Sequence, residues 1–235
     1  MSADADFVLV HGAGLGAWIW ERLLQHLPSP ALAVDLPGRG ANPAPRSAVG
    51  MHAAVRSLTA EVADWTEDPV VLVGHSLGAM VALGAASQLG DRVRRVVLVG
   101  GGVGRSGASY FAVLPTRVRI PLRLVTRLRI PAPRAAIRRT LCNDLDADTA
   151  ALVASRTKLP EPRRMYTEPV SWDAIPASVP LTYVKLLRDR AVSPDLQDRF
   201  ATNLGRAKVV TLDTGHLPML GKPEDLAAVL TRTLA

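Results

Sequence analysis

Three residues that lie far apart in the chain could together carry out nucleophilic catalysis: Ser76, Asp189 and His216. A serine hydroxyl is a poor nucleophile at neutral pH, so it needs a base within hydrogen-bond reach and a third group that orients the base. Ser76 is the central residue of the pentapeptide Gly-His-Ser-Leu-Gly at residues 74–78. The pattern Gly-x-Ser-x-Gly is typical of a nucleophile elbow, in which the serine occupies a sharp turn between a strand and a helix. The alternative is an ordinary serine in a loop bounded by glycines.

The residues on either side of this pentapeptide favour the elbow. Residues 70–73 are apolar and largely β-branched, which predicts a short buried strand. Residues 79–89 contain no proline and few β-branched residues, which predicts a helix. The glycines at positions 74 and 78 allow the backbone to turn tightly. We therefore expect the hydroxyl of Ser76 to be exposed at the carboxyl end of a sheet.

The choice of base rests on where the histidines fall. Four of them fall in or beside predicted helices, next to Ser76, or before a glycine-rich loop: His26, His52, His75 and His11. His216 instead lies in a loop just beyond a predicted strand at residues 208–212. Catalytic groups of α/β proteins gather at such strand ends. His216 is therefore the predicted base, and a purely structural histidine is the alternative.

The acid that orients this base is expected at the end of another strand. The predicted strand at residues 181–187 is followed by Arg-Asp-Arg, which places Asp189 at its carboxyl end. Two acids in the first turns of the following helix, Asp195 and Asp198, have a simpler role in compensating the helix dipole. Asp213 precedes His216 by three residues and is the alternative to Asp189.

Acyl transfer also requires backbone N–H groups where negative charge develops on the substrate. Leu77 directly follows the proposed nucleophile and supplies one of them. The second is expected from the loop at residues 11–16, His-Gly-Ala-Gly-Leu-Gly, with Ala13 as the donor. The alternative for this loop is phosphate binding, but its alternating glycines lack the wider gap of a dinucleotide fingerprint.

The elements that must position these residues alternate between strand and helix. Apolar runs predict strands at residues 7–10, 31–34, 70–73 and 93–99, with helices between them. Such alternation predicts a parallel sheet covered on both faces, within a single domain over residues 1–235. The alternation stops near residue 103 and resumes near residue 180. We interpret residues 103–175 as a helical insertion, with short helices at residues 121–130, 133–141 and 146–158.

These motifs resemble the α/β-hydrolase superfamily, and most closely its plant-type methylesterases and hydroxynitrile lyases with their bacterial relatives. The resemblance rests on the His-Gly-Ala loop, on Asp35-Leu36-Pro37-Gly38, on the elbow, and on Asp189 and His216 in the expected chain order. It covers the chain to about residue 100 and again from about residue 180. It implies an α/β-hydrolase fold with a mostly parallel eight-stranded sheet, a helical cap inserted after the sixth strand, and hydrolysis of small-molecule esters.

Three functions are consistent with this resemblance. The first is a serine hydrolase that cleaves a small-molecule carboxylic ester or thioester through an acyl-enzyme on Ser76. The second is a lyase or another non-hydrolytic biosynthetic enzyme, and the third is a ligand-binding receptor on the same fold. Hydroxynitrile lyases of this type carry Thr and Lys where this chain has Gly12 and Leu217, which disfavours the lyase. A serine nucleophile also disfavours the dehalogenases and epoxide hydrolases, which use Asp.

The charge of the chain is concentrated in the predicted insertion. The net charge is +7, and residues 102–175 carry 13 Lys and Arg against 6 Asp and Glu. No interleaved aromatic residues or recognisable motif indicates nucleic-acid binding. The arginines form either a solvated helix face or a surface that attracts an anionic partner, such as an acidic substrate or a carrier protein.

Composition adds expectations about location and cofactors. No apolar run approaches the roughly 18 residues of a membrane span, and the first residues are acidic rather than basic, so we expect a cytoplasmic protein. Cys142 is the single cysteine and is interpreted as a small core or cap residue. We expect no metal and no cofactor. The sequence gives no indication of oligomeric state.

Overall fold

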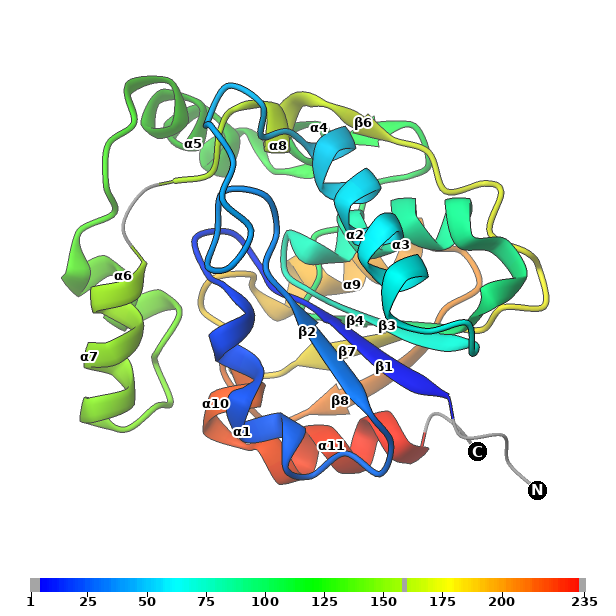
Figure 1. Ribbon diagram of the computed structural model, residues 1–235. Helices are drawn as coiled ribbons and strands as arrows, with labels where there is room; N and C mark the ends of the chain where they lie inside the picture. Colours follow the sequence, from blue (N-terminus) through cyan, green and yellow to red (C-terminus); the bar gives the residue numbers. More distant parts are fainter. Residues whose placement is uncertain (1–4, 158–159, 233–235) are drawn as a thin grey trace.

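The computed structural model describes residues 5–157 and 160–232. Its main sheet contains six parallel strands in the order β2-β1-β3-β4-β7-β8 (Figure 1). These strands are β1 (Asp6–Val10), β2 (Ala31–Val34), β3 (Val70–His75), β4 (Val93–Val99), β7 (Leu181–Leu186) and β8 (Lys208–Leu212). Each one coincides with an apolar run in the sequence. The expected α/β fold is confirmed, but the described residues form six main-sheet strands and not the eight implied by the resemblance.

Helices cover both faces of the sheet. Outside the insertion they are α1 (Glu21–Leu24), α2 (Met51–Trp65), α3 (Gly78–Leu89), α9 (Pro194–Asn203), α10 (Pro218–Gly221) and α11 (Pro223–Arg232), with 3-10 helices at η1 (Ala17–Trp20) and η2 (Gly90–Arg92). Strand side chains alternate between the faces, as a period of two requires. Val8 and Leu72 belong to the core beneath α2, α3 and α9. Phe7 and Val71 belong to the core beneath α1, α10 and α11.

The segment between β4 and β7 contains residues 103–175, for which the sequence predicts a helical insertion. Here the structure has β5 (Ala108–Ser109), α4 (Tyr110–Val113), α5 (Thr116–Leu128), α6 (Arg134–Thr140), α7 (Ala147–Arg156), α8 (Arg164–Thr167) and β6 (Pro169–Val170). The short strands β5 and β6 pair antiparallel in a separate sheet. The segment lies at the carboxyl end of the main sheet (Figure 1). It follows β4, which is the fourth strand along the chain and not the sixth, because the main sheet has fewer strands than the resemblance implies.

The helices of the insertion differ from the predicted ones mainly at α5. This helix begins five residues earlier than predicted, at Thr116, and Pro121 lies inside it. Pro115 is the N-cap residue of this helix, and its carbonyl accepts bonds from the N–H groups of Val118 and Arg119. By contrast, Asp146 caps α7 as its position predicts, because its side chain accepts the N–H of Thr149 at 2.8 Å. The predicted end of that helix, at residue 158, lies outside the described residues.

In the described residues, no helix has both the length and the apolar character needed to span a membrane.

Candidate active site

Ser76 lies on the turn between β3 and α3, where the sequence places it. Its φ angle is +52°, in the left-handed region that residues other than glycine rarely adopt. Three backbone bonds hold this conformation: Ser76 donates to the carbonyl of Val99 at 3.1 Å, and its own carbonyl accepts from Gly102 and Ala79, both at 3.2 Å. A serine held in a strained conformation by its surroundings is the geometry of a nucleophile elbow.

The glycine loop after β1 packs directly against this turn. A Cβ atom placed on Gly12 would lie 2.8 Å from the Cβ of Ser76 and 3.0 Å from Nδ1 of His75. Only glycine therefore allows the loop to approach the elbow so closely. Ala13 follows Gly12, and Leu77 follows Ser76, so the two predicted oxyanion donors belong to segments in contact with each other. In the part of the chain that the structure describes, neither of their N–H groups donates to a protein acceptor.

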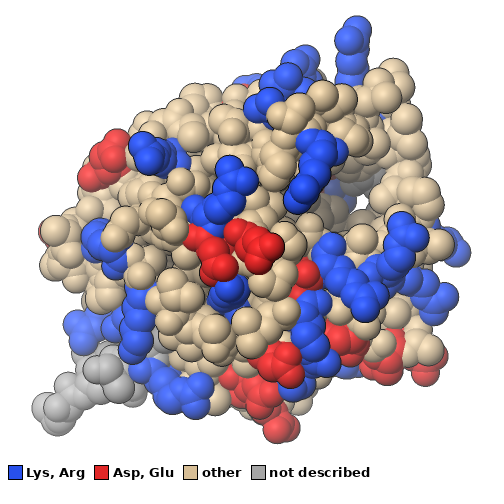
Figure 2. Space-filling view, turned by 180° about the vertical axis from the view of Figure 1, so that it is seen from behind, with Lys and Arg blue, Asp and Glu red and all other residues tan. Residues whose placement is uncertain are grey.

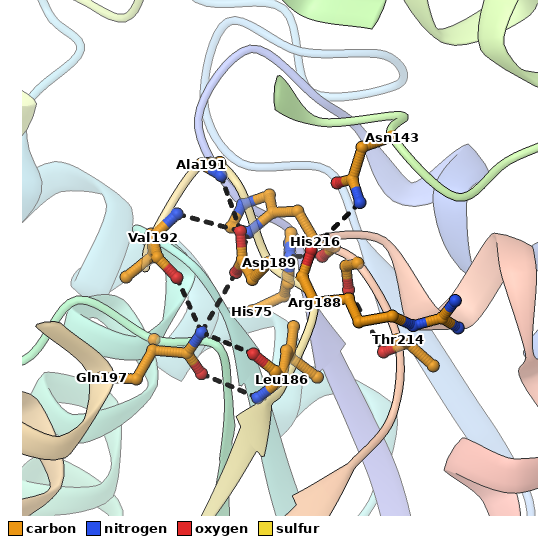
Figure 3. Close-up of polar contacts among 12 residues, drawn as sticks. His75, Asn143, Leu186, Arg188, Asp189, Ala191, Val192, Gln197, Thr214 and His216 are labelled. Carbon is orange, nitrogen blue, oxygen red and sulfur yellow. Dashed lines mark hydrogen bonds and ion pairs between the residues drawn. The ribbon is translucent and has the colours of Figure 1, made fainter. Parts of the chain in front are cut away.

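His216 and Asp189 are brought together from the loops after β8 and β7. Nδ1 of His216 lies 2.7 Å from Oδ2 of Asp189, and both residues are buried. The other carboxylate oxygen, Oδ1, accepts the N–H groups of Ala191 at 2.7 Å and Val192 at 2.9 Å (Figure 3). These two backbone donors fix the orientation of the carboxylate. Because a carboxylate only accepts, Nδ1 carries the proton of the neutral imidazole, and Nε2 is left as a base.

Gln197 of α9 fixes the position of Asp189 through hydrogen bonds. This role of Gln197 was not predicted from the sequence. Its side chain is fully buried and bonds both backbone groups of Leu186, accepting the N–H at 2.8 Å and donating to the carbonyl at 3.1 Å. Its Nε2 also donates to the carbonyl of Val192 at 2.7 Å and to Oδ2 of Asp189 at 3.3 Å (Figure 3). The sequence signal was a glutamine three residues before the buried Phe200, on the apolar face of a helix.

The side chain of His75 contacts His216. Its Nε2 lies 2.8 Å from the backbone carbonyl of His216, and the two rings are 4.7 Å apart. Burial lowers the pKa of His75 well below its ordinary value of 6.5, and the neighbouring His216 lowers it further. His75 is therefore neutral at neutral pH and donates its Nε2 proton to that carbonyl.

Tyr110, the first residue of α4, places part of the insertion next to the elbow. Burial, helped by the charge of Asp189, raises the pKa of Tyr110 to about 12, and the side chain of Ser76 acts in the opposite direction. The ring packs edge-on against Tyr166 of α8, with centroids 5.8 Å apart. Sequence motifs gave no signal for this residue, because its position depends on how the insertion folds back over the sheet.

The buried carboxylate of Glu161 joins the insertion to the glycine loop. Glu161 accepts the backbone N–H of Gly14 at 2.9 Å and pairs with Arg39 at 2.6 Å. Arg39 follows the turn after β2, so three separate segments meet at this carboxylate. Nearby, Nε2 of His11 accepts the N–H of Leu36 at 3.1 Å. These contacts fix the loop that contains Ala13 from two sides.

An apolar cavity of about 230 Å³ opens next to the glycine loop. Its walls come from both parts of the chain, with Ala13 and Gly14 on one side and Leu122, Val125 and Tyr166 of the insertion on the other. A larger groove of about 400 Å³ runs between α2, α3 and β6, and none of the predicted site residues lines it.

Comparison with known proteins places this fold and site in a family. Residues 7–229 match the Alpha/beta hydrolase family. The chain therefore belongs to the α/β-hydrolases, and it is a hydrolase of the carboxylesterase type. The resemblance deduced from the sequence motifs is confirmed.

Individual relatives cover almost the whole chain. "Lipase LipV" of Mycobacterium tuberculosis is 30% identical, over 99% of this chain and 94% of its own length. The "Pimeloyl-[acyl-carrier protein] methyl ester esterase" of Aromatoleum aromaticum is 28% identical, over 96% of each chain. Among solved structures, an extracellular α/β-hydrolase from a Paenibacillus species superposes with a TM-score of 0.88 at 18% identity, over 97% of this chain and 98% of that one. It is described as a structural and functional homologue of tobacco Salicylic Acid Binding Protein 2.

Proposed function

We propose that this protein hydrolyses a small-molecule carboxylic ester or thioester through an acyl-enzyme formed on Ser76. The observation that carries the proposal is the buried 2.7 Å contact between His216 and Asp189, formed at the carboxyl end of the sheet that also presents Ser76. Together these residues supply a nucleophile, a base and an orienting acid.

The reaction follows from the protonation states of these groups. Nε2 of His216 removes the proton of Ser76 as the serine oxygen attacks the ester carbonyl carbon. The negative oxygen of the tetrahedral intermediate is held by the N–H groups of Ala13 and Leu77. His216 then returns the proton to the leaving alcohol or thiol, and the acyl group stays on Ser76. His216 then takes a proton from water as the water oxygen attacks the acyl carbon. The bond between that carbon and the oxygen of Ser76 breaks, His216 returns the proton to Ser76, and the acid is released.

The proposed substrate has a short apolar group, and residues 103–175 act as the cap that selects it. The cavity beside Ala13 is smaller than the roughly 300–1,000 Å³ typical of pockets for drug-sized ligands. Leu122 and Val125 from the cap give it apolar walls. Because the arginines of the cap are positively charged, we include in the proposal an anionic ester and an ester on a carrier protein. The name of the relative from Aromatoleum aromaticum supports the carrier-bound ester.

The non-hydrolytic alternative finds less support in the side chains. Leu217 is apolar and 1% exposed, and it occupies the position where the related lyases carry Lys. It offers no charge for a departing anion. A receptor function is the third possibility, and it does not require the buried pairing of Asp189 with His216.

Labelling with a fluorophosphonate, followed by a panel of p-nitrophenyl esters of graded acyl length, tests this proposal. We expect stoichiometric labelling, loss of label and turnover in Ser76→Ala, and highest activity on the shortest acyl groups. Adding a carboxylated ester to the panel at low and high salt tests the anionic substrate, since only electrostatic attraction is screened. Unchanged turnover in Ser76→Ala contradicts the proposal.

A further inference from the structure

The outer face of α5 exposes a row of large aliphatic side chains. Ile120, Leu124 and Leu128 are spaced four residues apart and are 62%, 55% and 58% exposed. This spacing places them one above another on one side of the helix. Ile130, just beyond the helix, is also 44% exposed. A continuous row of exposed apolar side chains is typical of a surface that binds another protein or a membrane.

Arginines accompany this row and no acid offsets them. Residues 105–139 contain nine Arg and neither Asp nor Glu. On α5 itself, Arg117 precedes Ile120 by three residues and Arg127 follows Leu124 by three, so both neighbour the apolar row. Figure 2 shows the molecule from behind, so α5 and α6, at the left of Figure 1, lie on its right side. Lys and Arg side chains gather in the upper right of this view.

The opposite face of α5 faces the cavity beside the glycine loop. Leu122 and Val125 line that cavity together with Ala13. Helix α5 therefore separates an apolar cavity from an apolar, basic outer surface.

The chemistry of the surface selects among possible occupants. A second copy of the chain would bring two arginine-rich faces together with no acid to pair them. The core of a typical protein interface is enriched in Tyr, Trp, Phe and Met, and the sequence of α5 contains none of these. Aliphatic residues flanked by arginines on one helix are instead the composition of helices that lie in a membrane interface.

We propose that the outer face of α5 docks on a lipid surface that carries anionic headgroups. The aliphatic row enters the boundary between headgroups and acyl chains, and the arginines bind the lipid phosphates. Docking does not require hydrolysis, so the inference is independent of the function proposed for Ser76.

Sedimentation of the 235-residue protein with vesicles tests the inference. We expect the protein to pellet with vesicles of phosphatidylcholine mixed with phosphatidylglycerol and to remain in solution with phosphatidylcholine alone. High salt should release it, because the attraction to anionic lipid is screened. Ser76→Ala should bind the vesicles as the unmodified protein does, which separates this result from any failure of the hydrolase assignment.

Two sets of variants on the exposed face make the test specific. Replacing Arg117 and Arg127 by Gln should weaken binding about 25-fold, since each arginine near an anionic surface is worth roughly a factor of five. Replacing Ile120, Leu124 and Leu128 by Ser should abolish it. Val209→Ser and Arg94→Gln are the matched controls, because both residues are exposed on the main domain. Retention of the far-ultraviolet circular dichroism spectrum and of the midpoint of urea unfolding shows that each variant is folded.

The inference is overturned by equal binding to neutral and anionic vesicles, by no binding, or by variants that bind like the controls. Retention of the protein on immobilised acyl carrier protein through the same α5 residues, without vesicle binding, identifies a protein-docking surface and also overturns it.

Discussion

Replacing Asp189 by Asn should remove most of the turnover while leaving the fold largely intact, because the two oxygens of this carboxylate have different partners. Oδ1 accepts the N–H groups of Ala191 and Val192 at 2.7 and 2.9 Å, and Oδ2 lies 2.7 Å from Nδ1 of His216. The side chain of Asn has one oxygen and one NH₂ group. Its oxygen must face the two backbone donors, since an NH₂ group there would leave both N–H bonds unmade.

The NH₂ group of the introduced amide is then left to face His216. Nδ1 of His216 must accept that bond, so the imidazole proton moves to Nε2, the atom that has to remove the proton from Ser76. The wrong tautomer of such a base lowers kcat about ten thousandfold, which corresponds to about 5.4 kcal/mol of transition-state stabilisation. The backbone hydrogen bonds survive, so the free energy of unfolding should fall by only about 1–2 kcal/mol.

Three measurements follow this variant: kcat on a short p-nitrophenyl ester, unfolding in urea, and nitrogen NMR of the imidazole tautomer. Asp195→Asn is the matched control, because Asp195 is an exposed acid at the start of α9 and should leave kcat unchanged. Asp213→Asn tests the alternative orienter, which pairs with Arg188 and is 66% exposed. Retention of more than about a tenth of kcat in Asp189→Asn, or a larger loss in Asp213→Asn, refutes the assigned role of Asp189.

Two further predictions concern buried groups around the site. Burial lowers the pKa of both His11 and His75. Below about pH 6.5 the unfolded chain therefore binds protons at these histidines that the folded chain does not. The free energy of unfolding should then fall on acidification, by up to about 1.4 kcal/mol per pH unit for each histidine. Urea titrations on either side of that pH measure it, and a flat profile contradicts it. Gln197→Leu should lower the free energy of unfolding by about 2–4 kcal/mol, because the N–H of Leu186 and the carbonyl of Val192 lose their partner. The control is Asp198→Asn, at a side chain that is 57% exposed, which should lower it by less than about 1 kcal/mol.

The sheet could be predicted because its signal is local. Each main-sheet strand coincides with an apolar run, and strands such as β3 read as continuous apolar runs because helices bury both of their faces. The number of eight strands was wrong for the described residues because it came from the resemblance and had no matching apolar runs in this chain. Helix α5 was misplaced for a different reason. Proline is favoured at the first position of a helix, which is where the prediction placed Pro121. In the structure Pro115 is the N-cap residue and Pro121 lies inside the helix.

The contact between Asp189 and His216 could also be predicted, because the carboxyl ends of neighbouring parallel strands meet at one edge of a sheet. The groups that hold these residues could not. Gln197, Tyr110 and Glu161 are buried polar side chains whose partners come from other elements of the fold. No pattern of spacing marks such partners, because they depend on tertiary distances and not on periodicity.

Some expectations remain predictions. The oxyanion roles of Ala13 and Leu77, the cap role of residues 103–175 and the cytoplasmic location are not tested by the fold or by the relatives. The same is true of an anionic or carrier-bound substrate.

The central claim is that catalysis passes through an ester on Ser76, and intact-protein mass spectrometry tests it most directly. Mixing the enzyme with a p-nitrophenyl ester and quenching in acid during the first turnovers should trap a species heavier by one acyl group. Proteolytic mapping should place this group on Ser76, and Ser76→Ala should show no such species. An acyl group on another residue, or rapid hydrolysis by Ser76→Ala, would contradict the account.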